Sequence, residues 1–136
     1  DPARRLPGFA GFNRGKRSRL FAPGDPGARE ALQRAAAGAD LIFIDEAWLR
    51  SLEDAGTGLE VFEREGRAVL CRVPHGGAAG RELPCDEDAF AAASGIMWVQ
   101  PGHEPGPTRY AFPALGVFTG MLAAAAGMAG LLARER

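Results

Sequence analysis

The sequence predicts an α+β fold: a small extramembrane domain with a short β-hairpin or sheet and one or two helices, followed by one C-terminal transmembrane helix. Three observations predict this fold. No charged side chain lies between Arg109 and Arg134, so a helix there would be apolar on every side. Short strand-like runs alternate with helical patterns between residues 27 and 100. Proline and glycine punctuate the first 26 residues, which favours an irregular N-terminal arm.

Composition divides the chain into an extended basic arm at 1–26, a small α+β domain at 27–100, a Pro/Gly linker at 101–110 and a single transmembrane helix at 111–133. The first 20 residues carry six basic side chains and one acidic side chain, a net charge of +5 in a chain whose total is −1. An arm lying on an acidic protein surface or on anionic lipid would use this charge, and so would the remnant of a targeting sequence. We expect no nucleic-acid partner, because the remainder of the chain is acidic.

Two helices are expected in the α+β domain. Asp25 is a helix N-cap with Pro26 at the first helical position, and Gly38 ends that helix after Ala37. A second helix is expected over Glu46–Ala55, where the apolar side chains fall on one side.

Strand signals lie between and after these helices. Asp40–Asp45 is a short apolar run typical of a buried strand. Leu59–Phe62 and Arg67–Val73 flank Glu65-Gly66, which predicts a β-hairpin. Ile96–Gln100 is a candidate third strand.

The run from Ala111 to Ala133 would form a helix roughly 34 Å long, enough to cross a hydrocarbon core of about 30 Å. Tyr110 and Phe112 are expected at one membrane interface, and Arg134 and Arg136 at the other. A core helix of a soluble protein is also apolar, but a chain of this length offers little else to surround one.

Small residues predict a helix-packing face at Gly116, Gly120, Ala124 and Gly127. Such a face suits a neighbouring helix in a larger membrane complex, and a simple anchor rich in alanine and glycine would look the same. No cofactor is expected to be bound by the chain itself, although chlorophyll, carotenoid or lipid would contact this face within a complex.

The roles of the two cysteines and two histidines have more than one interpretation. Cys71 and Cys85 would pair in an oxidising compartment and remain thiols in a reducing one. His75 and His103 lie in Gly/Pro-rich loops, where solvated side chains are the rule, and either would serve as a pigment or metal ligand within a complex. Their spacing with the cysteines matches no zinc pattern, so no metal site is predicted.

Acidic residues provide one motif and one cluster. The apolar run before Asp45-Glu46 resembles a Walker B strand, but Ala10–Arg17 lacks the glycine and hydroxyl residue of a phosphate-binding loop. The cluster is interpreted as a solvated face, able to dock a basic partner or shield a cation, and comprises Glu82, Asp86, Glu87 and Asp88.

These observations predict a non-catalytic, single-pass accessory subunit of a large energy-converting membrane complex, with photosynthesis slightly favoured over respiratory electron transport. No nucleophile and base form a recognisable set, so no enzyme is expected. The alternatives are a membrane-anchored binding or sensor module and a degenerate nucleotide-binding domain. Larger membrane subunits and lipid are the expected partners. The expected location is a thylakoid, inner mitochondrial or bacterial inner membrane, with the C-terminus on the stromal, matrix or cytoplasmic side.

Overall fold

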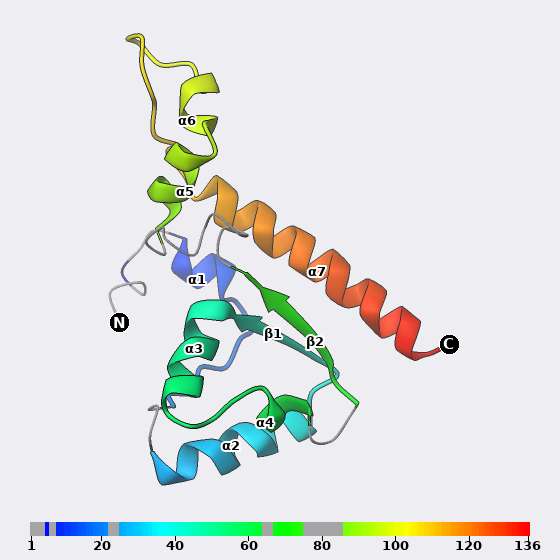
Figure 1. Cartoon of the computed structure of the whole chain (residues 1–136). Coiled ribbons are helices and arrows are strands. Elements are labelled where there is room, and N and C mark those ends of the chain that lie inside the picture. The colour runs from blue at the N-terminus through cyan, green and yellow to red at the C-terminus, as the bar shows by residue number, and fades with distance from the viewer. Residues whose placement is uncertain (1–4, 6–7, 22–24, 64–66, 75–85) are drawn as a thin grey trace.

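The structure, a computed structural model, describes residues 5, 8–21, 25–63, 67–74 and 86–136. Two strands form a sheet, and helices cover both of its faces (Figure 1). In chain order the elements are α1 (Phe9–Phe12), α2 (Pro26–Ala37), β1 (Leu41–Asp45), α3 (Glu46–Asp54), α4 (Glu60–Glu63), β2 (Val69–Val73), α5 (Glu87–Ala93), α6 (Ile96–Val99) and α7 (Ala114–Arg134).

Several predicted elements are confirmed. Asp25 caps α2 by accepting a hydrogen bond from the Gly27 N–H at 2.9 Å, and α2 ends at Ala37 as expected. The apolar run after it forms β1, and α3 follows directly. The mixture of helices with a small sheet agrees with the predicted α+β class.

The sheet is parallel, which corrects the predicted hairpin. Leu41 pairs with Val69, and the register continues to Asp45 opposite Val73. Parallel strands cannot be joined by a tight turn, and here the chain passes through α3 and α4 between them. The expected turn at 64–66 lies outside the described residues.

Two predicted strands are helical instead. Most of Leu59–Phe62 falls in α4, because Val61 is buried against Leu32 of α2 and Leu52 of α3. This tertiary contact outweighs the weak strand preference of so short a run. Most of Ile96–Gln100 forms α6, which starts after Gly95 at a φ of 75°.

The helix α7 covers the other face of the sheet. A Cβ atom built on Gly127 would lie 2.6 Å from Leu41 Cδ2, and one built on Gly130 would lie 2.6 Å from Val69 Cγ1. Glycine at these two positions therefore allows α7 to approach the strands closely. Because side chains alternate along a strand, Ile44 faces the opposite layer, where it is 1% exposed.

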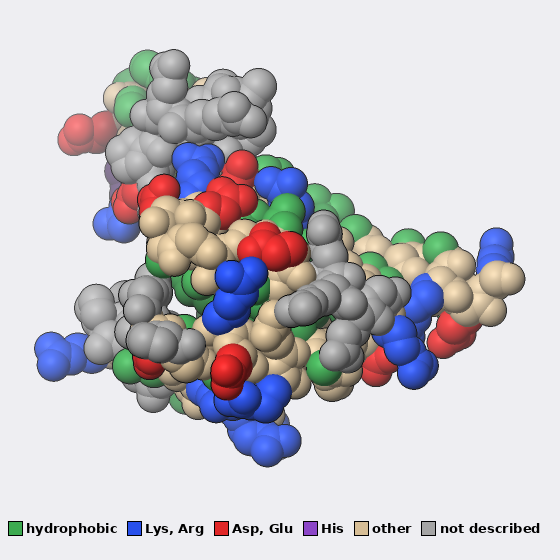
Figure 2. All heavy atoms as spheres, turned by 60° about the horizontal axis from the view of Figure 1, so that its bottom comes forward, with side chains coloured by type: hydrophobic (Ala, Val, Ile, Leu, Met, Phe, Trp, Pro, Cys, Tyr) green, Lys and Arg blue, Asp and Glu red, His purple; other side chains and the backbone are tan. Residues whose placement is uncertain are grey.

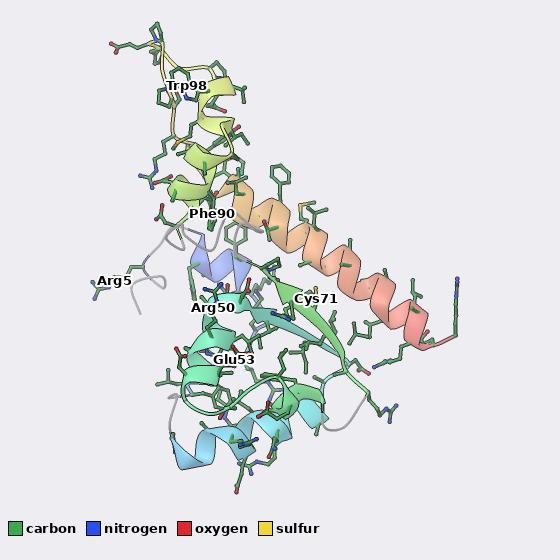
Figure 3. The ribbon with its side chains drawn as sticks, viewed as in Figure 1. Arg5, Arg50, Glu53, Cys71, Phe90 and Trp98 are labelled. Atoms are coloured by element: carbon green, nitrogen blue, oxygen red, sulfur yellow. The ribbon has the colours of Figure 1, made fainter. Side chains whose placement is uncertain are left out.

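The helix α7 runs antiparallel to both strands. Arg134, in its last turn, donates to the Arg67 carbonyl at 2.6 Å and to the Asp40 carboxylate at 3.0 Å, and both residues precede the strands. Farther along β2, the Cys71 Sγ lies 3.7 Å from the Ala123 carbonyl oxygen (Figure 3). The N-terminus of α7 therefore lies at the carboxyl end of the sheet.

By length and composition, the 21 residues of α7 are enough to cross a membrane. Core helices of soluble proteins meet the same criterion. Charged side chains of both signs mingle on the face of the molecule in Figure 2, whereas hydrophobic side chains follow the visible edge of α7. Its large exposed apolar residues are Phe118, Met121, Leu122, Met128 and Leu132.

Candidate active-site edge of the sheet

The carboxyl ends of β1 and β2 form one edge of the sheet, where α3 begins and toward which the N-terminus of α7 points (Figure 1). In parallel α/β sheets, ligands bind outside the carboxyl ends of the strands. Backbone N–H groups at helix N-termini also favour anions there. This edge is therefore the first place to look for reactive side chains.

The acids at the end of β1 are used to start α3. Asp45 Oδ1 accepts hydrogen bonds from the Ala47 and Trp48 N–H groups at 2.9 and 3.0 Å, so Asp45 is the N-cap. Glu46, in the first turn, lies 3.6 Å from Arg50 as an ion pair. The Asp-Glu pair that resembles a Walker B motif thus has a clear structural role.

Glu87 is placed differently. It is half-buried in α5, and its Oε1 accepts a hydrogen bond from the Leu115 N–H in the first turn of α7 at 2.9 Å. Its Oε2 has no hydrogen-bond partner among the described residues. A Cβ atom built on Gly116 would lie 3.2 Å from that oxygen, so the glycine leaves space beside the carboxylate.

Both neighbouring acids have structural partners. Asp86 caps α5 by accepting from the Asp88 and Ala89 N–H groups. Asp88 forms a bidentate pair with Arg109, with Nη2–Oδ2 and Nε–Oδ1 distances of 2.7 and 2.9 Å. The pair fixes α5 against the segment that leads into α7. The Glu87 carboxylate, which is held through one oxygen while the other is open, can act as a base or as a nucleophile.

The four residues of the predicted helix-packing face do not pack against one common neighbour within the chain. Gly127 is buried against the strands, and Gly116 lies beside Glu87. Gly120 and Ala124 are exposed, and nothing lies within 4 Å of a Cβ atom built on Gly120. The stripe that contacts the sheet is instead Ala123, Gly127 and Gly130.

The predicted interface residues have partners within the protein or face solvent. Tyr110 and Phe112 contact each other edge to face, with ring centroids 6.3 Å apart. Arg134 ties the end of α7 to the residues that precede both strands, and Arg136 is exposed.

The predicted thiol and imidazole sites are only partly described. Cys71 is half-buried on β2, whereas Cys85 and His75 lie outside the described residues, so the disulfide stays a prediction. His103 is exposed in the loop after α6. In the described part of the chain, no three side chains of the metal-ligating kind lie close enough together to hold an ion.

Sequence reasoning missed Glu87, which it placed on a solvated acidic face. The reason is physical. Its hydrogen-bond partner, Leu115, is 28 residues away, and only the packing of α7 on the sheet brings the two together. No local pattern distinguishes Glu87 from Asp86 and Asp88.

Comparison with curated proteins and with solved structures found no match. The model of CoA-transferase family III, however, matches residues 1–136. This match contradicts the prediction of a non-catalytic membrane accessory subunit and the prediction that the chain is not an enzyme, because the family is one of enzymes. The same finding contradicts the two alternative predictions, a membrane-anchored binding or sensor module and a degenerate nucleotide-binding domain.

The match also corrects the predicted setting, because nothing in it points to photosynthesis, electron transport or a thylakoid. The error came from α7, whose apolar composition suits lipid as well as it suits contact with the strands. A parallel sheet covered by helices on both faces is compatible with an enzyme fold. On the family match over its full length, the chain belongs to CoA-transferase family III.

Proposed function

We propose that this chain contributes the catalytic edge of an enzyme that moves coenzyme A from an acyl thioester to a second carboxylic acid. The family match over residues 1–136 carries this proposal. The geometry supports it, because a half-buried carboxylate with one open oxygen lies at the N-terminus of α7.

We assign the reacting carboxylate to Glu87. Its Oε2 attacks the thioester carbonyl of the donor, which expels the coenzyme A thiolate and leaves an acyl–Glu87 anhydride. The thiolate then attacks the Glu87 carbonyl, which releases the donor acid and leaves a Glu87 thioester. The acceptor carboxylate repeats the two steps in reverse, so that new acyl-CoA leaves and the Glu87 carboxylate is restored. No oxidant, reductant or net proton is needed.

The surroundings of Glu87 suit these steps. The Leu115 N–H and the positive end of the α7 dipole stabilise the carboxylate before attack. The same N–H donates to the Glu87 carbonyl oxygen when negative charge develops on it. Gly116 leaves room for the acyl group that joins Oε2.

Isotope exchange tests the reaction with a panel of acids rather than with one chosen substrate. The protein is mixed with each of several short-chain acyl-CoA thioesters and the matching carbon-13-labelled free acid. Mass spectrometry then follows label that enters the thioester. We expect exchange for at least one acid, and its absence across the panel contradicts transfer by this chain.

Substitution of Glu87 tests the assignment. Glu87→Gln keeps the size of the side chain and should lower kcat about 100-fold or more. Gly116→Val should also lower activity, because it crowds Oε2. Asp86→Asn is the matched control and should leave exchange near the wild-type rate. Near-normal exchange by a folded Glu87→Gln variant would move the reacting carboxylate elsewhere.

For α7, we propose a place in the layer that covers the sheet rather than a membrane span. Gly127 and Gly130 support this placement, because they allow close approach to both strands. Arg134 supports it as well, through its hydrogen bonds to the residues before both strands. Alkaline carbonate washing of cell membranes tests it: release of the chain is expected, and retention favours integration into the bilayer.

A further inference from the structure

The N-terminus of α7 takes its cap from another helix. Pro113, at the N-cap position, supplies no side-chain hydrogen bond, and the first N–H groups of a helix have no partner within it. Glu87 of α5 supplies an acceptor instead, because its Oε1 receives the Leu115 N–H at 2.9 Å. This hydrogen bond depends on where α5 lies, and Figure 1 shows α5 beside that end of α7.

Apolar packing alone gives α5 a weak hold on its position. The helix has seven residues, all of them described, and only Ala91 among them is buried. An isolated helix needs roughly 12 residues to be even marginally stable in water. Because α5 is shorter and buries one small side chain, its placement depends on its polar contacts with the rest of the chain.

Polar contacts tie α5 and α6 to the segment that leads into α7. The Thr108 N–H donates to the Met97 carbonyl of α6 at 2.8 Å. The next residue, Arg109, binds both oxygens of Asp88, at 2.7 and 2.9 Å. A guanidinium that binds a carboxylate in this two-pronged way fixes its orientation as well as its distance. Asp88 directly follows Glu87 in α5, so the pair restrains the backbone from which Glu87 projects.

We infer that Arg109 is a positioning residue for Glu87. The inference rests on the proposed function, which makes Glu87 the reacting carboxylate. Through Asp88, Arg109 holds α5 so that one Glu87 oxygen stays on the Leu115 N–H and the other faces the space beside Gly116. Arg109 itself makes and breaks no bond. It raises the fraction of molecules in which Glu87 is placed for attack, so its loss should lower kcat and leave KM unchanged.

Hydrogen exchange tests the inference without catalysis. Leu115 lies in the first turn of α7, so protection of its N–H reports on the bond to Glu87. NMR on the full chain measures the exchange rate. Arg109→Gln should raise it about fivefold, the upper end of what an exposed ion pair contributes. The Arg109 side chain is 75% exposed, so this variant should fold. Glu87→Ala should raise the rate further, and an unchanged rate in either variant overturns the inference.

Two further variants separate position from charge. Arg29→Gln breaks the pair with Glu60 at 3.0 Å, which joins α2 to α4, and should leave Leu115 exchange at the wild-type rate. Arg109→Lys keeps the charge but loses the fork that binds both oxygens of Asp88, so it should restore slow exchange only in part. An equal increase in Arg29→Gln and Arg109→Gln overturns the inference, and so does wild-type exchange in Arg109→Lys.

Kinetics link position to reaction and separate this inference from the proposed function. In the carbon-13 transfer assay, Arg109→Gln should lower kcat about fivefold with an unchanged KM for acyl-CoA, and Arg29→Gln should match the wild type. Asp88→Asn should lose as much as Arg109→Gln, and the double variant no more, because all three break one interaction.

The possible outcomes bear on different claims. Additive losses in the double variant, or faster Leu115 exchange with an unchanged kcat, overturn the inference and leave the proposed function standing. If Leu115 exchange responds as expected but the wild type transfers no label to any thioester, the proposed function alone is defeated.

Discussion

The helices α3 and α7 cover opposite faces of the same two strands, yet their sequences reveal this role very differently. In α3, Leu49 and Leu52 are each 2% exposed, charged residues occupy the other side, and Asp45 caps the start. In α7, no charge appears before the last turn, and the N-cap residue, Pro113, provides no side-chain cap. An amphipathic helix tells which side is buried, whereas a uniformly apolar helix does not.

The contrast explains why the sequence indicates which side of α3 is buried and does not indicate this for α7. The length and composition of α7 fit a membrane span and a covering layer equally well. The choice depends on contacts with Leu41 and Val69, which are distant in sequence.

The two helices should differ most in the free energy of unfolding lost on truncating a leucine. Leu52→Ala should cost about 3 kcal/mol, because it leaves a cavity in the buried cluster. Leu122→Ala should cost no more than about 0.5 kcal/mol, because this α7 side chain is 72% exposed. Urea denaturation measures both. A large cost at Leu122 would show that another surface covers α7.

Glycine substitutions should separate the sheet-facing side of α7 from its exposed side. Gly127→Leu should destabilise the protein by about 2 kcal/mol, because its side chain would collide with Leu41 and Phe43. Gly120→Leu should be neutral, or stabilising by up to about 1 kcal/mol, because space there is open and leucine favours helix. The reverse order in urea denaturation would place the predicted Gly116–Gly120 face against the strands.

The start of α3 should depend on its own cap. Asp45→Ala should lower the free energy of unfolding by about 1 kcal/mol, because the Ala47 and Trp48 N–H groups lose their acceptor. Asp45→Asn, the control, keeps an acceptor oxygen and should change it by a few tenths of a kcal/mol, about the scatter between good caps. Thermal unfolding of both variants measures the difference. Equal losses would show that charge, not capping, is what Asp45 supplies.

The smallest effect concerns the contact of α2 with α4. The Gly58 N–H donates to Glu60 at 3.0 Å and holds the pKa of Glu60 below its usual value, and Arg29 acts in the same direction. A lowered pKa in the folded state stabilises the protein above the unfolded pKa, and this stability is lost as pH falls through the folded pKa.

Glu60→Gln should therefore be slightly less stable than the wild type at neutral pH. The two unfolding curves should converge in acid, below the folded pKa of Glu60. Glu53→Gln makes the same charge change on α3 and serves as the control. A difference between wild type and Glu60→Gln that persists in acid would assign the effect to packing rather than to ionisation.

The sequence was sufficient where local chemistry decides the structure. The Asp25 cap predicted α2, apolar side chains on one side predicted α3, and the apolar run between the two helices predicted β1. Prediction from the sequence failed where the contacts that decide the structure join residues far apart along the chain. The pairing of β2 with β1, the helical state around Val61 and the bond from Leu115 to Glu87 all depend on tertiary contacts.

The candidate active-site edge depends on the placement of α7 on the sheet. A designed crosslink tests this placement most directly. Cys71 Sγ lies 3.7 Å from the backbone of Ala123, so Ala123→Cys would place two thiols together. In a Cys85→Ser background, mild oxidation should give an intramolecular disulfide for Ala123→Cys and none for Leu122→Cys, whose side chain is exposed. Crosslinking of both variants alike, or of neither, would contradict the account.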